Sequence, residues 1–240
     1  MSSTHLNVRY SKMQKKARAP RRKPEQRTTE ILAAARTVFE EYGYANSKVS
    51  EIAQRVGVAE GTIFTYFPSK RALIVELIIR WYRQLIEDTG KGLNGIFGTR
   101  ARLNFIIWHH LKTLLKNDAL CAVIIQESRQ LQDDVAFTIR KLNREYTDLL
   151  QEELQQGIAN GDILAGISPS LVRSLVFGGI EHIFWDCHGS NRKIDLDQTA
   201  DDFAASLFLG IFSPSKSSNL ELRLSTLISE IENKLDTKST

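Results

Sequence analysis

The segment SKVSEIAQRVGVAEGTIFTYFPSK, residues 47–70, carries the strongest structural signal in the sequence. Apolar residues at helical spacing predict one short helix over residues 49–56 and another over residues 60–66. Gly57 supplies a tight turn between them, and Ser47 is a suitable N-cap for the first helix. Two short helices joined in this way form a helix-turn-helix, in which the second helix places its N-terminal side chains in the major groove of DNA.

The helical pattern continues on both sides of this segment. Helix signals and caps predict further helices over residues 25–42, 70–87, 102–116, 119–129, 132–159, 168–185, 197–212 and 220–235. We find no strand-like alternation bounded by turns, so we expect an all-α fold. Gly90, Gly92, Gly95 and Gly98 are expected to form a loop between two of these helices.

The composition is that of an ordinary globular protein. The chain has 240 residues, of which 42% are apolar and 25% charged, which excludes a wholly disordered or collagen-like chain. Two cysteines provide no disulfide framework and fit a reducing compartment. No apolar run approaches the roughly 20 residues of a membrane helix, and the charged N-terminus is not expected to be a secretory signal. We therefore expect a cytoplasmic protein without a membrane partner.

Positive charge is concentrated near the N-terminus. Residues 1–80 hold 15 Lys/Arg and 7 Asp/Glu, a net charge of +8, and the stretch from Lys12 to Lys23 contains no acidic residue. Such a run repels itself, and nucleic acid is its natural polyanionic partner because binding releases counterions. A solubilising tail and an anionic membrane surface are the alternatives for this arm. Whether the arm contacts DNA is a separate hypothesis from the helix-turn-helix.

Residues 25–84 resemble the N-terminal DNA-binding domain of TetR-family transcriptional regulators (TetR/AcrR type). The residues that carry the resemblance are Ile31, Ala34, Ala35, Phe39, Gly43, Tyr44, Val49, Ile52, Ala53, Gly57, Val58, Gly61, Thr62, Ile63, Tyr66, Phe67, Ser69 and Lys70. The resemblance implies a helix-turn-helix DNA-binding domain (24–84) and a helical effector-binding and dimerisation domain (85–213). Composition and helical pattern, not the resemblance, predict a disordered basic arm (1–23) and a flexible tail with a terminal helix (214–240).

The resemblance also implies a set of DNA contacts. It places Ser47, Lys48 and Val49 near the phosphate backbone, and Lys70 on a phosphate. Close approach to the groove is implied at Gly61 and Thr62, and contacts with bases and phosphates at Phe64, Thr65 and Tyr66. The sequence departs from the family at Ala59, which cannot cap the recognition helix, and at Phe64, which lacks a tyrosine hydroxyl and is expected to contact a thymine methyl or a sugar.

The C-terminal half contains two helices that are too apolar to face solvent, over residues 171–185 and 203–212. The resemblance implies that both form a two-fold dimer interface, where Gly178, Gly179, Ala204 and Ala205 let backbones approach; burial within one subunit is the alternative. Aromatic residues suggest a pocket with few polar groups for an apolar effector such as a fatty acid, an acyl-CoA or a hydrophobic drug. The expected lining residues are Trp81, Phe105, Trp108, His109, Phe137, Phe177, His182 and Trp185.

Two other motifs are weak. Residues 90–95 spell G-x-G-x-x-G, but no strand precedes them, so we expect no dinucleotide cofactor. His182 and Asp186 share a helical face, yet no further ligand motif accompanies them, so no metal is expected. No catalytic arrangement can be assembled by spacing, which leaves an all-α enzyme as a distant alternative.

The sequence therefore predicts a homodimeric, effector-controlled transcriptional repressor that binds a palindromic operator. Its recognition helices are expected in major grooves roughly 34–36 Å apart. We expect the helix over residues 70–87 to couple the effector to the DNA-binding heads. The alternative is a DNA-binding interaction protein of the same fold that has no small-molecule effector.

Overall fold

The computed structural model describes residues 23–130, 134–190 and 192–212, together with Leu224 and Ile228. Three predicted segments fall outside the described residues: the basic arm up to residue 22, residue 132 at the expected start of one long helix, and the expected terminal helix apart from Leu224 and Ile228. Within them the chain is all-helical, as predicted, apart from one isolated bridge between Ile163 and Phe212. The helices are α1 (Pro24–Asn46), α2 (Val49–Val56), α3 (Glu60–Tyr66), α4 (Lys70–Gly92), α5 (Thr99–Lys116), α6 (Asp118–Gln130), α7 (Asp134–Ala159), α8 (Pro169–Cys187) and α9 (Leu196–Ile211).

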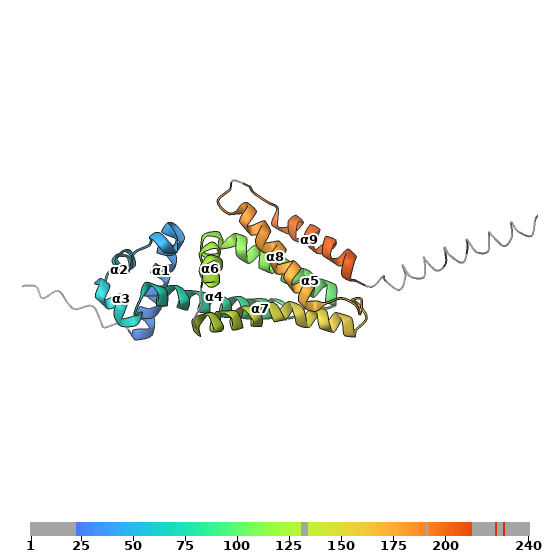
Figure 1. Ribbon diagram of the computed structural model, residues 1–240, viewed down its shortest axis with the longest axis horizontal. Coiled ribbons are helices and arrows are strands. Elements are labelled where there is room, and N and C mark those ends of the chain that lie inside the picture. The colour runs from blue at the N-terminus through green and yellow to red at the C-terminus, as the bar shows by residue number, and fades with distance from the viewer. Residues whose placement is uncertain (1–22, 131–133, 191, 213–223, 225–227, 229–240) are drawn as a thin grey trace, which may run out of the picture.

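Helices α1, α2 and α3 form a small head at one end of an elongated molecule (Figure 1). Gly43 interrupts α1 with a φ of 70°, and Gly57 ends α2 with a φ of 74°. Both values lie in the left-handed region that glycine adopts without a steric penalty, so each glycine lets the chain turn sharply. The two turns bring Ile52 of α2 and Ile63 of α3 into the head core, where both are fully buried.

Helix α4 leaves the head and runs along α7 in the body of the molecule (Figure 1). It continues to Gly92, five residues beyond the predicted end, so the expectation that Gly90 and Gly92 lie in a loop is wrong. A β-carbon at Gly92 would lie 2.2 Å from the ring of Phe105 on α5. Gly92 is therefore needed for close packing between two helices, whereas Gly95 and Gly98 have positive φ angles in the loop that follows.

The body has two apolar cores that meet between α4 and α8. One core joins the head to α4, α6 and α7, and the other joins α5 to α7, α8 and α9. Trp81 of α4 and Phe177 of α8 pack against both cores. The boundary expected at residues 84 and 85 falls inside the continuous helix α4, so α4 belongs to the head and the body alike.

Helix α6 connects the body to the head. Leu120, Val123 and Ile124 of α6 are buried in the same core as α1. A hydrogen bond of 3.1 Å from Arg36 of α1 to the Asn117 side chain, which precedes α6, adds a polar link. Helix α6 therefore packs directly against the head.

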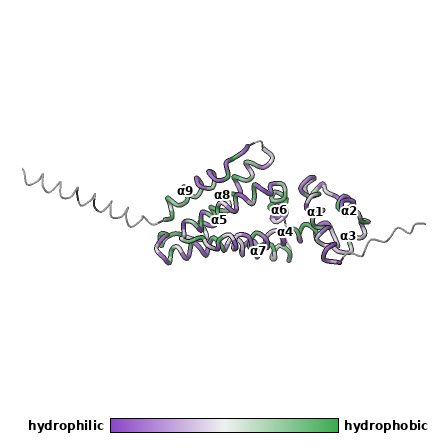
Figure 2. The backbone as a smooth tube through the Cα atoms, turned by 180° about the vertical axis from the view of Figure 1, so that it is seen from behind, coloured by the Kyte–Doolittle hydropathy of each residue, from purple (hydrophilic) through white to green (hydrophobic). Residues whose placement is uncertain are grey.

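Helices α8 and α9 are the most apolar of the long helices in the described part of the chain (Figure 2). Ser168 caps α8 as predicted, since its side chain accepts a hydrogen bond from the Leu171 backbone N–H. In the described part of the chain, no helix is both long and apolar enough to cross a bilayer.

Candidate DNA-binding interface and ligand cavity

The outer face of α3 presents a small set of side chains to solvent. Gly61 and Thr65 are exposed, and Phe64 keeps 44% of its surface accessible. The Thr65 hydroxyl donates a hydrogen bond of 3.1 Å to the Gly61 carbonyl, which leaves its oxygen lone pairs and its methyl group facing outward. Thr62 is half-buried beside them. This face combines a close-approach glycine, an apolar ring and a hydroxyl, as expected for a helix that enters a DNA groove.

Other features of α3 also agree with the sequence. Ala59 is the N-cap residue and provides no side-chain hydrogen bond, as predicted. Phe67 is buried in the head core, and Tyr66 is half-buried against the same core. Tyr66 therefore has one side available for DNA.

At the start of α2 the structure differs from the prediction. Lys48, not Ser47, is the N-cap residue, and its backbone N–H donates a 2.9 Å hydrogen bond to the Glu51 carboxylate. Ser47 is buried, and its hydroxyl donates to the Tyr44 carbonyl at 2.8 Å. Val49 is buried as well. Of the three residues predicted near phosphate, only Lys48 presents its side chain to solvent, because the other two anchor α2 to the head.

Lys70 occupies a different environment from the one expected. Its ammonium donates to the carbonyl oxygens of Tyr44, Ser47 and Ala45, at 2.6, 2.9 and 3.2 Å, and lies 4.6 Å from the centre of the Tyr44 ring. An ammonium has three N–H donors, and all three have acceptors here. Lys70 therefore ties the start of α4 to the turn before α2. Its phosphate contact stays a prediction, and it requires the ammonium to leave one of these carbonyls.

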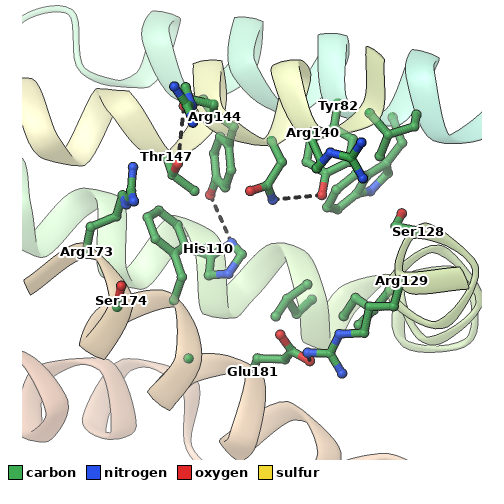
Figure 3. Close-up of a pocket in the computed structure, with 18 residues that line it drawn as sticks. Tyr82, His110, Ser128, Arg129, Arg140, Arg144, Thr147, Arg173, Ser174 and Glu181 are labelled. Atoms are coloured by element: carbon green, nitrogen blue, oxygen red, sulfur yellow. Dashed lines mark hydrogen bonds and ion pairs between the residues drawn. The ribbon is translucent and has the colours of Figure 1, made fainter. Parts of the chain in front are cut away.

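A cavity of about 620 Å³ lies in the body, where the two apolar cores meet (Figure 3). Helices α4, α5, α6, α7 and α8 all contribute side chains to its wall. The lining residues are Trp81, Tyr82, His110, Leu114, Ile125, Ser128, Arg129, Ile139, Arg140, Asn143, Arg144, Tyr146, Thr147, Arg173, Ser174, Phe177, Gly178 and Glu181.

Polar groups buried in the wall are paired in a definite pattern (Figure 3). The Tyr146 hydroxyl lies 2.9 Å from Nδ1 of His110, and Asn143 donates a 2.9 Å hydrogen bond to the Tyr82 hydroxyl. Burial lowers the pKa of His110 to about 3, so the imidazole is neutral at physiological pH. The hydroxyl oxygen of Ser128 is buried and has no partner among the described residues. It is a polar atom that a bound molecule can satisfy.

Among its described lining residues, the cavity also has four arginines and a single carboxylate, that of Glu181. Arg140 and Arg144 are exposed on α7 one turn apart, and neither forms an ion pair with a described residue. Arg173 lies 3.7 Å from Asp148, and Arg129 forms a 2.5 Å ion pair with Glu181. The expectation of an aromatic pocket with few polar groups is therefore wrong, because one side of the cavity is strongly cationic.

Of the eight side chains predicted to line a pocket, the structure places Trp81 and Phe177 in the cavity wall. The other six lie elsewhere. On α5, His109 stacks on Phe105 at 5.4 Å, and Nε1 of Trp108 donates to Asp197 of α9 at 2.7 Å. These three residues point away from His110 and from the cavity, because each residue along a helix is turned by about 100° from the one before it.

The remaining predicted residues are on surfaces or in other contacts. Phe137 is 69% exposed on α7. The His182 side chain is 80% exposed and lies 3.9 Å from Asp186. Nε1 of Trp185 donates a 3.0 Å hydrogen bond to Glu181 at the cavity edge. Among the described residues, no three metal-capable side chains converge near His182 or anywhere else.

Sequence reasoning missed most of the polar lining. Arg140, Asn143, Arg144 and Thr147 follow the i, i+3, i+4, i+7 spacing of one helical face on α7. This stripe lies next to the apolar positions of the same helix, and it contains no acidic residue. An uncompensated pair of arginines beside an apolar stripe is the signal that could have identified it.

The predicted dimer-forming helices have exposed apolar faces. Leu171 and Leu175 of α8 are 60% and 55% exposed, and Leu209 of α9 is 90% exposed. The small residues serve another purpose within the subunit: a β-carbon at Gly179 would lie 2.8 Å from the Phe203 ring, and Ala204 is buried. Gly178 lines the cavity, so of the four small residues Ala205 is the one whose exposed side chain remains for an interface.

Comparison with known proteins agrees with the geometry. Residues 31–77 match the family of bacterial regulatory proteins, tetR family, and residues 80–210 match the C-terminal region of YsiA-like proteins. The fatty acid metabolism regulator protein of Bacillus subtilis is 30% identical over 182 residues, which cover 76% of this chain and 94% of the relative.

Solved structures show the same relationship. The regulator FadR from Bacillus subtilis, in complex with stearoyl-CoA, is 29% identical with a TM-score of 0.67, covering 75% of this chain and 96% of that one. The fatty acid degradation regulator FadR from Bacillus halodurans is 27% identical with a TM-score of 0.66, covering 76% and 98%. The chain thus belongs to the TetR family, with a YsiA-like C-terminal region, and it is a DNA-binding transcriptional repressor rather than an enzyme.

Proposed function

We propose that this repressor acts in the cytoplasm as a homodimer that binds a palindromic operator and releases it when an acyl-CoA fills the cavity. The observation that carries the ligand assignment is the pair of guanidinium groups on Arg140 and Arg144, which have no ion-pair partner among the described residues and lie beside the apolar part of the cavity wall. A fatty acid alone has a single negative charge, whereas coenzyme A brings several phosphate charges. Guanidinium groups bind phosphate oxygens through charge-assisted hydrogen bonds.

The inner wall suits the rest of such a ligand. Ile125, Ile139 and Leu114 offer apolar surface for an acyl chain. The Ser128 hydroxyl offers a hydrogen bond to an amide or a thioester carbonyl, which would satisfy its buried oxygen. The similarity to a fatty acid metabolism regulator protein, and to a FadR structure in complex with stearoyl-CoA, supports the same ligand class. An effector-free interaction protein would be expected to fill this space, so the cavity favours the effector-controlled alternative.

The dimer follows from the exposed leucines on α8 and α9. Three largely exposed leucines on two adjoining helices are costly in water and are typical of a subunit interface. Symmetry then gives two recognition helices and a palindromic site. Leu209→Glu should convert the protein to a monomer in analytical ultracentrifugation and abolish tight operator binding. A dimer that survives both this change and Leu175→Glu would place the interface elsewhere.

The ligand assignment is tested by operator release. A labelled promoter fragment bound to the repressor is titrated with palmitoyl-CoA, palmitate or coenzyme A, and fluorescence anisotropy reports dissociation. We expect palmitoyl-CoA to release DNA at concentrations at least about tenfold below those needed for either fragment, because only the thioester occupies both parts of the cavity. Equal potency of palmitate and palmitoyl-CoA would refute the phosphate-binding role of the arginines.

A further inference from the structure

Helix α6 lies between the cavity and the head and has a different role on each side. Ile125, Ser128 and Arg129 line the cavity. Leu120, Val123 and Ile124 are buried in the core that α6 shares with α1 of the head. A change in the position of α6 at the cavity therefore alters the support of the head.

Cys121 and Ala122 of α6 are buried in the second apolar core, which also contains residues of α8, and polar contacts link the two helices near their ends. At one end of α6, Asp118 lies 2.6 Å from the His188 ring. At the other end, Arg129 forms its 2.5 Å ion pair with Glu181, and both residues line the cavity (Figure 3). Glu181 also accepts a hydrogen bond from Trp185 on its own helix, which holds the carboxylate in place.

Among the described residues that line the cavity, Glu181 is the single carboxylate, and it faces a wall that contains four arginines. It supplies the negative charge that Arg129 needs while the cavity holds no ligand. A polyanionic ligand offers Arg129 a second partner of the same sign as Glu181. The two anions repel each other and compete for one guanidinium, so they do not share it at full strength.

We propose that the Arg129–Glu181 ion pair is a latch that holds α6 against α8 in the DNA-binding state, and that the anionic group of the ligand replaces Glu181 on Arg129. This proposal rests on the proposed acyl-CoA function and names its switch. Once Glu181 is displaced, the end of α6 that carries Arg129 is released from α8, while the contact between Asp118 and His188 holds the other end. The helix can then tilt, and its packed face no longer holds the head in the operator-binding position. Ligand binding and operator binding are then linked through one ion pair.

Glu181→Gln is the sharpest test, because glutamine keeps the acceptor for Trp185 and removes only the charge. We expect this variant to bind palmitoyl-CoA about fivefold more tightly, because the ligand no longer competes with a carboxylate. We also expect the ligand-free variant to bind its operator about fivefold more weakly than the wild type does. Asp186→Asn is the matched control. It removes the same charge from the same helix at a residue outside the cavity wall, and it should change neither affinity.

A double-mutant cycle separates a latch from a general charge effect. Arg129→Gln should also weaken operator binding by the ligand-free repressor. Adding Glu181→Gln to this variant should cause no further loss of operator affinity and no gain in palmitoyl-CoA affinity. A latch is refuted if Glu181→Gln tightens ligand binding equally with and without Arg129, or if it behaves like Asp186→Asn. If the wild-type repressor ignores palmitoyl-CoA, the proposed function fails, and the operator affinities of the three variants still decide whether the latch exists.

Discussion

The head and the cavity are two binding regions built in opposite ways. The DNA-binding face comes from one short stretch of chain, with Gly61, Phe64 and Thr65 on a single helix of seven residues. The cavity takes its wall from five helices spread between Trp81 and Glu181. The head therefore depends on local turns and on a small core, whereas the cavity depends on how distant helices pack. Substitutions in the head are therefore expected to change DNA binding, and substitutions in the cavity wall are expected to change ligand binding.

The largest effect is expected when the arginines on the cationic side of the cavity are replaced, and it is an effect on ligand affinity. Replacing Arg140 and Arg144 together by glutamine should weaken palmitoyl-CoA binding about 100-fold, because two charge-assisted contacts with phosphate are lost. Isothermal titration calorimetry measures this loss. Ligand-free operator affinity should stay unchanged, which would confirm that the two regions are separable.

The control for this variant is Lys141→Gln on the same helix. Lys141 is exposed and lies 3.8 Å from Glu145, outside the cavity wall. Its loss should leave ligand affinity within about twofold of the wild type. If Lys141→Gln weakens palmitoyl-CoA binding as much as the arginine changes do, the arginines act only through the net charge of α7.

The second effect concerns the head, where Lys70 either supports the fold through its contacts with backbone carbonyls or contacts a DNA phosphate. Lys70→Met should destabilise the ligand-free protein by about 2 kcal/mol, because three backbone carbonyls lose a charged donor. Differential scanning fluorimetry without DNA detects that loss. A phosphate contact predicts a different signature: unchanged melting, with the slope of log affinity against log salt reduced by about 1.

The same comparison explains what the sequence could predict. The end of α2 and both bounds of α3 follow from local periodicity and from Gly57, and the structure confirms them, whereas the N-cap of α2 is Lys48 and not the predicted Ser47. The cavity was harder, because choosing His109 instead of His110 turns a side chain by about 100° around α5. Arg140 and Arg144 resemble an ordinary solvated helix face until α6 and α8 are placed opposite them. Local signals thus determine the head, and tertiary packing determines the cavity.

A third effect is the response of the body to acid. The pKa of His110 is lowered from 6.5 to about 3 because the ring is buried, so only the unfolded chain binds its proton between these values. Stability therefore falls as the pH decreases below 6.5. At pH 5.5 the cost from this residue is about 1.4 kcal/mol relative to neutral pH.

His110→Gln removes the titrating group and keeps a polar partner for Tyr146. Urea unfolding of both proteins between pH 7.5 and 5 measures the difference. The variant should lose about 1.4 kcal/mol less than the wild type on going to pH 5.5, whatever its stability at neutral pH. Parallel pH profiles would mean that His110 becomes protonated in the folded protein without cost.

The smallest effect is expected at Thr65, where only sequence preference should change. Thr65→Ala removes a methyl group and a hydroxyl oxygen from the exposed face of α3, while the hydroxyl proton is already used by the Gly61 carbonyl. One base contact of this kind is worth about 1 kcal/mol, so operator affinity should fall about fivefold and affinity for random duplex should not change. Competition anisotropy with the two duplexes measures both values.

Thr65→Ser keeps the oxygen and loses the methyl group, so it shows which of them reads the base. An equal loss on both duplexes would make Thr65 a backbone contact and leave Phe64 as the residue on this face that distinguishes sequences.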